Sequence, residues 1–246
     1  MITLAIESST EIASLALFRG DGVIASERRP EPGRSNRPLF DALDAVLVRG
    51  GVRAAEIDRF VVGRGPGRYS GLRAALTLAR FLALPGDRPV WAVSSGAALA
   101  AATLRERGAP AVAVLGDARR GQYWLGIFRP EGSGPPRMEA EWAALPPDAL
   151  TSAVPADAIL VSPEFTHLRA QGLAARLGIG RWIAEDRGPD AVEVGALALA
   201  AERAGVPSEP LTPLYLHPPV SAGPAEMGGR AAPGPRRGLE TRTAME

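Results

Sequence analysis

Apolar and polar positions in the first part of the chain follow a β-like pattern that tight turns interrupt. Residues 2–7 form an apolar run that ends at an acidic side chain, residues 12–18 resume the pattern, and residues 23–28 return after a turn at Asp21-Gly22. Three strands joined by short turns predict an antiparallel opening of a sheet. A doubly wound fold would instead begin with a strand, a helix and a second strand.

A helix is predicted at residues 38–49, because apolar residues recur there at helical spacing and Gly50-Gly51 is typical of a helix end. Its predicted apolar face consists of Leu39, Phe40, Leu43, Val46 and Leu47. Residues 57–62 predict the following strand. Residues 72–84 predict a second helix, whose apolar stripe is Leu72, Ala75, Leu76, Ala79 and Leu82.

A short strand at residues 90–93 and an alanine-rich helix to about Arg105 follow, and Ser94 is a suitable N-cap for that helix. After Gly108-Ala109-Pro110 the pattern starts again. The predicted strands of this second half are 111–115, 122–128 and 158–161, and the predicted helices are 165–177 and 192–204. A turn is predicted at 117–121, and irregular connections are predicted at 130–136, 146–147 and 155.

This restart predicts two lobes, a first lobe at residues 1–107 and a second, smaller lobe at residues 108–217. Beyond them the composition changes, since ten of the 29 residues in 218–246 are proline or glycine. A segment with so few large apolar side chains cannot offset its ordering entropy, so residues 218–246 are predicted to be a disordered tail.

The amino-acid composition excludes several kinds of binding and catalytic site. The 246-residue chain has a net charge of +1, which gives no bulk field to hold nucleic acid or an anionic membrane. Cysteine is absent and all 28 basic residues are arginine, which excludes disulfides, thiolate zinc sites, a P-loop and a lysine Schiff base. Neither a signal peptide nor a membrane-spanning run is recognisable, so a cytoplasmic protein without membrane contact is expected.

The most informative segment is the glycine-rich run 63–73, between a predicted strand and a predicted helix. Such a turn directs backbone N–H groups and the helix dipole at one point, which favours an anion such as a phosphate, and arginine side chains strengthen that interaction. The alternative is a tight turn with solvated arginines, and the residues alone weigh the two about equally. The candidate partner- or anion-binding residues are Gly63, Arg64, Gly65, Pro66, Gly67, Arg68, Tyr69, Ser70, Gly71 and Arg73.

Glu7 ends the first predicted strand and is followed by the hydroxyl side chains of Ser8, Ser9 and Thr10. These residues could orient a magnesium-bound nucleotide. The competing interpretation, which is favoured for Glu7 taken alone, is a strand-terminal cap above a hydrogen-bonded turn.

Asp117 and Arg119 mark a turn in the second half, where a structural ion pair that shapes a hairpin is the favoured interpretation. The two histidines, His167 and His217, have no second histidine at helical spacing, so no metal site is predicted. No nucleophile has a recognisable general base, and no catalytic residue is predicted.

The order of these motifs resembles the TsaB (YeaZ) family. Its members open with a strand that ends in an Asp/Glu-Thr/Ser-Ser turn, matched at residues 5–10, and carry Gly-x-Gly-Pro-Gly-Ser-Phe-Thr-Gly-Leu-Arg, matched at residues 63–73. An Asp-Ala-Arg turn before a tyrosine strand is matched at 117–119 and Tyr123, and a Pro-x-Tyr-Leu at 213–216. The resemblance covers about residues 1–217.

Two departures from the family pattern are visible. Arg68, Tyr69 and Ser70 replace the usual Ser, Phe and Thr, and residues 34–36 read Arg-Ser-Asn where the family often has His-Ser. Tyr69 and Ser70 keep the aromatic and hydroxyl character, whereas Arg68 adds bulk and charge.

The resemblance implies an α/β fold of the actin-like, sugar-kinase-like (ribonuclease H-like) class, with two lobes and mixed sheets. It implies a subunit that has no cofactor of its own, with an adenine nucleotide as an option at a complex interface. The implied partners are a TsaD-like catalytic subunit, a TsaE-like ATPase, and tRNA contacted through the complex. Pairing is attributed to the two first-lobe helices, whose candidate contact residues are Leu39, Leu43, Leu76 and Arg80.

Three functions compete on this basis. The favoured one is a non-catalytic partner in transferring a threonylcarbamoyl group to an adenosine of tRNA. The alternative is a stand-alone small-molecule kinase or ATPase that uses Glu7 for magnesium and the glycine segment for phosphates. A glycopeptidase-like metalloenzyme would need a histidine pair that the sequence lacks. Whether the free protein is a homodimer stays open.

Overall fold

Two sheets and the helices around them make up the computed structural model, which describes residues 1–30, 37–132 and 134–216. The predicted disordered tail, His217 and residues 34–36 lie outside the described residues. The strands are β1 (Ile2–Glu7), β2 (Ile12–Arg19), β3 (Gly22–Pro30), β4 (Arg59–Gly63), β5 (Val90–Val93), β6 (Ala111–Arg119), β7 (Gln122–Arg129), β8 (Arg137–Leu145) and β9 (Ala158–Val161). The α-helices are α1 (Arg37–Gly50), α2 (Tyr69–Ala83), α3 (Ser95–Arg107), α4 (Pro147–Ala153), α5 (Phe165–Ala170), α6 (Leu173–Arg176) and α7 (Ala191–Arg203).

The two sheets repeat one pattern. In the first sheet the order is β3-β2-β1-β4-β5, with the first three strands antiparallel and β4 parallel to both β1 and β5. In the second sheet, β8-β7-β6-β9, the meander β6-β7-β8 is again antiparallel and β9 is parallel to β6. The expected antiparallel opening and the predicted actin-like, ribonuclease H-like arrangement with mixed sheets are confirmed.

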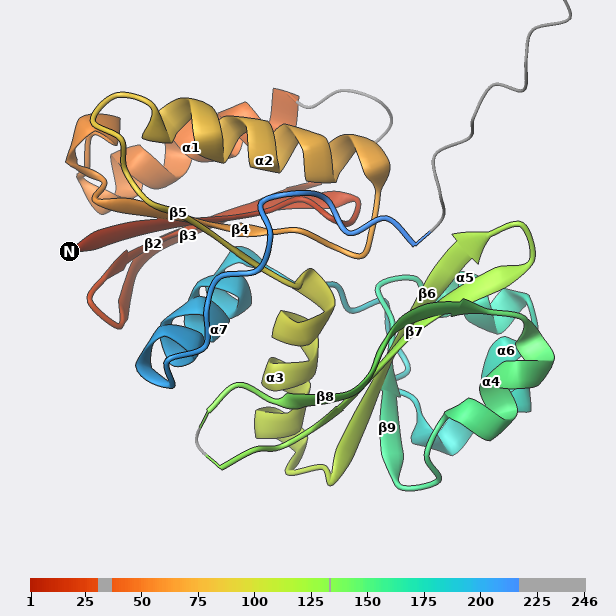
Figure 1. Cartoon of the computed structure of the whole chain (residues 1–246). Coiled ribbons are helices and arrows are strands. Elements are labelled where there is room, and N and C mark those ends of the chain that lie inside the picture. Colours follow the sequence, from red (N-terminus) through yellow and green to blue (C-terminus); the bar gives the residue numbers. More distant parts are fainter. Residues whose placement is uncertain (31–36, 133, 217–246) are drawn as a thin grey trace, which may run out of the picture.

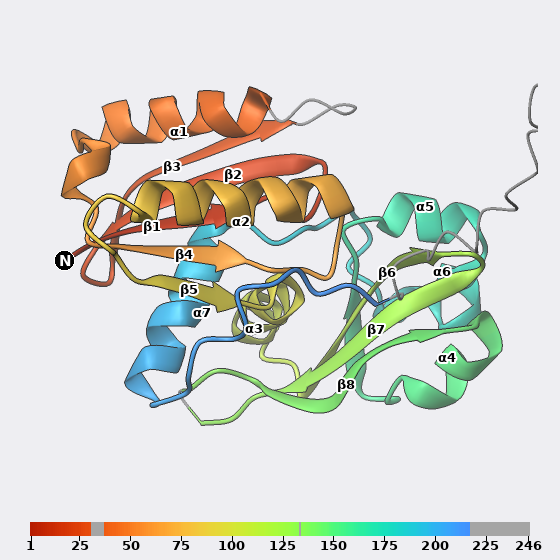
Figure 2. The ribbon, with the colours of Figure 1, turned by 45° about the horizontal axis from the view of Figure 1, so that its top comes forward.

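Five layers stack through the molecule, as Figures 1 and 2 show. Helices α1 and α2 lie side by side on the outer face of the first sheet, and α3 and α7 lie between the two sheets. Helices α4, α5 and α6 cover the far face of the second sheet. A separate apolar cluster fills each of the four interfaces between layers, which is how an α/β chain buries both faces of each sheet.

Helix α7 crosses back from the second half of the chain to the first sheet. Its side chains pack against Ala5, Phe18 and Val61 of the first sheet, and a capping box between Asp190 and Glu193 begins it. It lies within residues 108–217, the range predicted for the second lobe, so this range includes an element that packs on the first sheet. The predicted limits of the lobes themselves stay a prediction.

Three details differ from the expectations. The helix predicted at 165–177 is two helices, because Gly172 adopts a φ of +80° between them. The connection expected at Pro146-Pro147 instead begins α4, where proline at the first helical position costs no hydrogen bond. Strand β6 continues through the predicted turn as far as Arg119, with a bulge after Asp117.

Among the described residues, no helix combines the length and the apolar character that crossing a membrane requires.

Candidate functional site

The glycine-rich segment connects β4 to α2, but its last residues belong to the helix. Helix α2 begins at Tyr69, so Tyr69, Ser70, Gly71 and Arg73 lie in its first two turns rather than in a loop. Only the preceding residues, from Arg64 to Arg68, form the connection.

The glycines let this segment pack directly on the turn between β1 and β2. A β-carbon at Gly63 would overlap the Glu7 carboxylate, one at Gly67 would overlap Ser9, and one at Gly71 would overlap the carbonyl oxygen of Ser8. The Arg68 N–H donates to the Ser9 carbonyl oxygen at 2.7 Å. The segment predicted to surround an anion therefore receives the backbone of this chain's own β1–β2 turn.

Glu7 is fully buried at the centre of this contact. Its Oε1 accepts the Ser9 N–H at 2.5 Å, and its Oε2 accepts the Ser95 hydroxyl at 2.6 Å. The same hydroxyl accepts the Gly65 N–H at 3.0 Å, so one chain of hydrogen bonds joins β1, the glycine segment and α3. Burial raises the pKa of the Glu7 carboxyl above its usual value. The strand-terminal cap, rather than a magnesium ligand, is the role that this geometry supports.

The polar groups around Glu7 also bond within the chain. The Thr10 hydroxyl accepts the Ile12 N–H at 3.2 Å, which closes the turn. Ser8 is completely buried, and Ser9 nearly so. In the part of the chain that the structure describes, the Ser9 hydroxyl has no hydrogen-bond partner.

The three arginines of the segment contact protein groups. Arg64 donates to the carboxylate of Glu209 and to the carbonyl oxygen of Thr212, both at 2.8 Å. Arg68 donates to the Thr10 carbonyl oxygen at 3.3 Å, and Arg73 donates to the Tyr69 hydroxyl. All three guanidinium groups therefore have partners within the described part of the chain, as the tight-turn alternative requires of the fold around the segment.

The second-lobe turn is a structural ion pair, as the sequence favoured. Asp117 accepts the backbone N–H of Arg119 at 2.6 Å and its guanidinium at 2.9 Å. Two residues that the sequence did not indicate join this pair: His167 Nε2 lies 3.3 Å from Asp117, and Gln171 connects His167 to the Tyr123 hydroxyl. Over the described residues, no group of histidine and acidic side chains is arranged to hold a metal ion.

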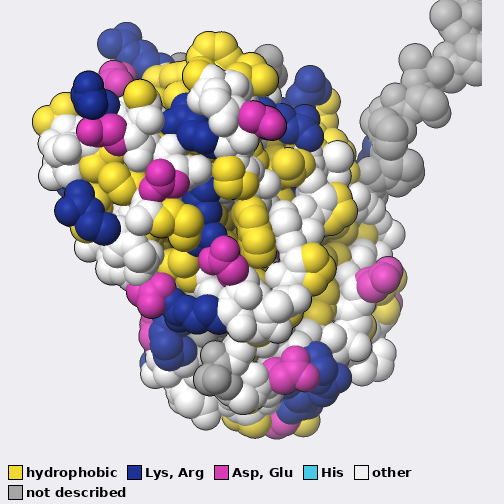
Figure 3. Space-filling view, turned by 60° about the vertical axis from the view of Figure 1, so that its left-hand side comes forward, with side chains coloured by type: hydrophobic (Ala, Val, Ile, Leu, Met, Phe, Trp, Pro, Cys, Tyr) yellow, Lys and Arg dark blue, Asp and Glu magenta, His cyan; other side chains and the backbone are white. Residues whose placement is uncertain are grey.

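The outward face of α1 and α2 carries exposed apolar side chains. Figure 3 shows hydrophobic side chains gathered at the top of the molecule, the edge that these two helices form in Figure 1. We call this surface the α1/α2 face; its exposed apolar members are Phe40, Val48, Tyr69, Phe81 and Leu84. Large exposed apolar patches on a soluble protein mark interaction surfaces.

Three of the four predicted contact residues on these helices are not on the α1/α2 face. Leu39, Leu43 and Leu76 are buried in the cluster between the helices and the first sheet, so their side chains cannot reach a partner. Their apolar spacing identified the inward face of each helix, which is the usual meaning of such a stripe. Arg80 is exposed and donates to the carbonyl oxygen of Leu211 at 2.7 Å. The signal that was missed is the outward position of Phe40 on α1 and of Phe81 on α2.

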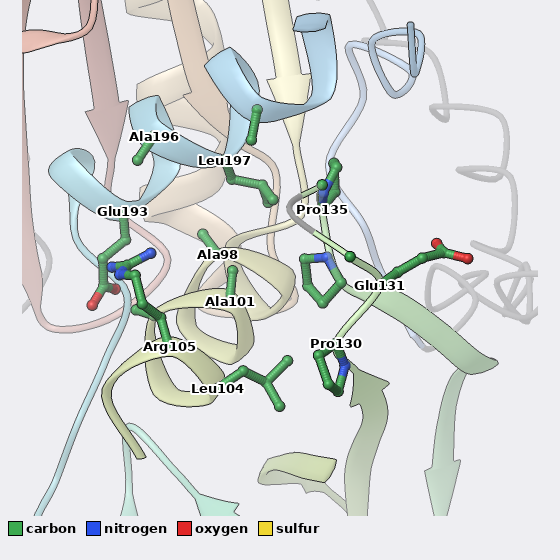
Figure 4. A pocket seen from close by; sticks show the side chains of 15 residues that line it. Ala98, Ala101, Leu104, Arg105, Pro130, Glu131, Pro135, Glu193, Ala196 and Leu197 are labelled. Carbon is green, nitrogen blue, oxygen red and sulfur yellow. The ribbon is translucent and has the colours of Figure 1, made fainter. Parts of the chain in front are cut away.

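A cavity of about 350 Å³ lies between α3, α7 and the connection from β7 to β8. Its walls are mostly alanine, leucine and proline side chains, and Glu193 and Arg105 lie together at one side (Figure 4). Burial and the negative charge of Asp190 raise the pKa of Glu193 to about 7, although Arg187 lies 3.3 Å away.

We expect this raised pKa to make stability depend on pH. A carboxyl that binds its proton more tightly in the folded than in the unfolded state favours folding at low pH and loses that contribution as the pH rises from about 4.5 to 7. Chemical denaturation at pH 5 and pH 8 should show the unfolding free energy falling by roughly 2 to 3 kcal/mol from Glu193, at about 1.4 kcal/mol per pKa unit. Glu193→Gln should flatten the profile to the slope left by Glu7; an unchanged profile would contradict the assignment.

Comparisons with known proteins agree with this architecture. The family model described as "TsaD: tRNA N6-adenosine threonylcarbamoyltransferase" matches residues 34–133. The tRNA threonylcarbamoyladenosine biosynthesis protein TsaB of Escherichia coli K12 is 28% identical over 184 residues, which is 74% of this chain and 70% of the relative. TsaB of Bacillus subtilis 168 is 34% identical over 129 residues, which covers 52% of this chain and 56% of the relative.

A solved structure extends the similarity to the whole fold. YeaZ from Pseudomonas aeruginosa superposes with a TM-score of 0.70 at 28% identity, and the match covers 87% of this chain and 100% of that one. The opening strand turn, the glycine segment and the Asp-Ala-Arg turn, which carried the resemblance in the sequence, all occupy structured positions in this fold. The sequence and structural similarities therefore support the resemblance to the TsaB (YeaZ) family.

Proposed function

We propose that this chain is a non-catalytic partner subunit of a TsaD-type protein, and that it acts in the transfer of a threonylcarbamoyl group to adenosine in tRNA. The observation that carries the proposal is the α1/α2 face, where Phe40 and Phe81 are exposed above helices whose inner sides are fully packed. An exposed aromatic side chain on each of two packed helices is the type of anchor that protein interfaces use.

A TsaD-type protein is the partner that this face fits. The TsaD family model matches residues 34–133, a range that includes both α1 and α2, so such a partner carries a related pair of helices. On this chain the exposed charges of α2 are two arginines, Arg73 and Arg80, and α1 presents two aspartates, Asp41 and Asp44, between Arg37 and Arg49 near its ends. Two related helix pairs packed about a twofold axis would bring the aspartates in the middle of α1 on one protein against the arginines of α2 on the other. A second copy of this chain would fit the same face, so we propose a homodimer for the free protein.

A cofactor of its own is not part of the proposal. The β1–β2 turn fills the space before the glycine segment, and its arginines bind protein groups, which leaves the stand-alone kinase or ATPase without a phosphate site at this position. Any adenine nucleotide would bind at the interface of the complex. The net charge of +1 gives this chain little attraction for RNA, so tRNA would bind to the assembled complex. A TsaE-type ATPase would contact the same complex, and we propose that the complex acts in the cytoplasm.

Phe81→Asp tests the proposal. We expect the Kd between this variant and the TsaD-family protein of the same organism, measured by isothermal titration, to rise at least about 100-fold. The reason is that the substitution removes an interface anchor and buries a charge. Threonylcarbamoyladenosine formation by the reconstituted complex should fall with it. Ile179→Asp on the second lobe is the matched control, because Ile179 is 53% exposed and Phe81 68%.

Two results would contradict the proposal. One is equal binding of the TsaD-family protein by Phe81→Asp and by the unmodified chain. The other is micromolar binding of ATP-Mg by this chain alone, with turnover, which would favour the kinase or ATPase.

A further inference from the structure

The chain after α7 runs back across the first lobe and ends beside the α1/α2 face. We call residues 205–216 the C-terminal strap; it is the blue segment that passes from α7 over β5 towards the start of α2 in Figure 1. At β5, the Ala92 N–H donates to the Ser208 hydroxyl and the Glu209 N–H donates to the Ala92 carbonyl oxygen, both at 3.0 Å. The strap is therefore fixed to the sheet before it reaches the helices.

The glycine segment holds the middle of the strap. Glu209 accepts the Ser94 N–H and the Arg64 guanidinium, each at 2.8 Å. The same Arg64 donates to the Thr212 carbonyl oxygen, and its own carbonyl oxygen accepts the Leu214 N–H at 2.8 Å. One arginine thus binds three successive parts of the strap, so the strap has a defined position up to its last described residues.

The end of the strap places an aromatic ring against the first turn of α2. Tyr215 stacks on Tyr69 with ring centroids 5.1 Å apart and planes at 22°, and the Arg73 guanidinium lies 5.2 Å from the Tyr69 centroid. Tyr69, Arg73 and Arg80 follow one another at spacings of four and seven residues, which places them on one face of α2. The exposed edge of Tyr215 is therefore continuous with the α1/α2 face.

Resting on the proposed function, we propose that the strap forms part of the docking surface, and that Tyr215 contacts the partner protein directly. The partner presents an apolar surface to the Tyr69–Tyr215 pair and a carboxylate to Arg73. Tyrosine suits such a place, because it buries a rigid ring and keeps its hydroxyl at the wetter rim.

The same observations favour a protein over an RNA at this position. A nucleobase binds an aromatic side chain by stacking on an uncovered ring face. Tyr69 already stacks with Tyr215 and has the Arg73 guanidinium over its ring. The pair belongs to the α1/α2 face, whose other exposed apolar side chains a protein surface would cover and an RNA backbone would not.

Three strap variants test the inference with the full-length chain and its TsaD-family partner. Tyr215→Ala should raise the Kd about 10- to 100-fold with little change in melting temperature, as loss of an interface aromatic does. Tyr215→Phe should keep most of the affinity. Val206→Ala is the control, since Val206 is 44% exposed and Tyr215 42%, but it lies at the other end of the strap.

Glu209→Ala separates contact from position. Removing the carboxylate takes away its bonds to Arg64 and Ser94 and leaves the strap held by Thr212 and Leu214, so the strap is held less firmly and the affinity should fall without any loss of a partner contact. Adding Tyr215→Ala to Glu209→Ala should then change the Kd little, because both substitutions remove the same placed ring. Fully additive effects would overturn the inference.

Other outcomes also decide the question. If Phe81→Asp abolishes binding while Tyr215→Ala leaves the Kd unchanged, the strap is outside the interface and only the proposed function stands. If neither substitution matters, the docking face itself is wrong. If Tyr215→Ala spares the partner but weakens tRNA binding by the complex, the ring serves RNA and the proposed protein contact is overturned.

Discussion

Gly71→Ala is expected to destabilise the protein by about 3 kcal/mol or more, the upper range for overpacking a well-filled interior. In an exposed helix the same change would stabilise by about 1 kcal/mol, because alanine is the better helix former. The sign reverses here because the new methyl group would overlap the carbonyl oxygen of Ser8. A backbone atom cannot avoid the clash by changing rotamer, so α2 or the β1–β2 turn must move.

Thermal unfolding followed by circular dichroism measures the effect. At about 2–4 °C per kcal/mol for a chain of this size, the midpoint should fall by roughly 10 °C. Gly180→Ala is the matched control, because a β-carbon at Gly180 meets no atom within 4 Å and its φ is not in the left-handed region. Equal midpoints for the two variants would show that the glycine segment is not packed on the turn.

The strands and helices of the first lobe were predictable because local pattern decides them. The runs at β1, β2 and β4 are buried on both faces of their sheet, and Ser94 does cap α3 by accepting the Ala97 N–H. Strand β8 was missed, although Met138, Trp142 and Ala144 alternate along it and pack on α3 and the second sheet. Its intervening glutamates gave it the composition of a loop, which is common for an edge strand.

The role of the glycine segment could not be predicted from the sequence. Glycines that admit a phosphate and glycines that admit a neighbouring turn satisfy the same local requirement, namely close approach of the backbone. The deciding group is the Ser8–Ser9 backbone, some sixty residues earlier in the chain, and the groups that bind Arg64 lie on the strap, 145 residues later in the case of Glu209. Contacts at such separation leave no periodic signal.

The apolar spacing of α1 alone could not show which of its apolar residues are buried in the core and which are exposed. The predicted face combined Phe40 with Leu43, but the helix is rotated so that Leu43 is 9% exposed and Phe40 52%. Residues three apart, such as Phe40 and Leu43, are separated by only about 60° around a helix, so the spacing cannot show at which of them the buried face ends.

Leu43→Asp and Phe40→Asp should therefore fail in different ways. Leu43→Asp places an unpaired carboxylate in the cluster beneath α1, which together with the lost apolar contacts should cost about 4 kcal/mol or more and leave much of the chain unfolded. Phe40→Asp should change the unfolding free energy by less than about 1 kcal/mol, as exposed substitutions do. It should still weaken binding of the TsaD-family partner.

Urea unfolding and titration with the partner, measured on the same preparations, distinguish the two effects. A charge at Leu43 removes binding only in proportion to the unfolded fraction, so partner in excess should restore the fold by mass action. A charge at Phe40 leaves the fold intact at every partner concentration and shifts the Kd itself. If Leu43→Asp stays folded but cannot bind the partner, the interface must lie on the side of α1 that packs against the sheet in this structure. The buried cluster that contains Leu39, Leu43 and Val46 argues against that result.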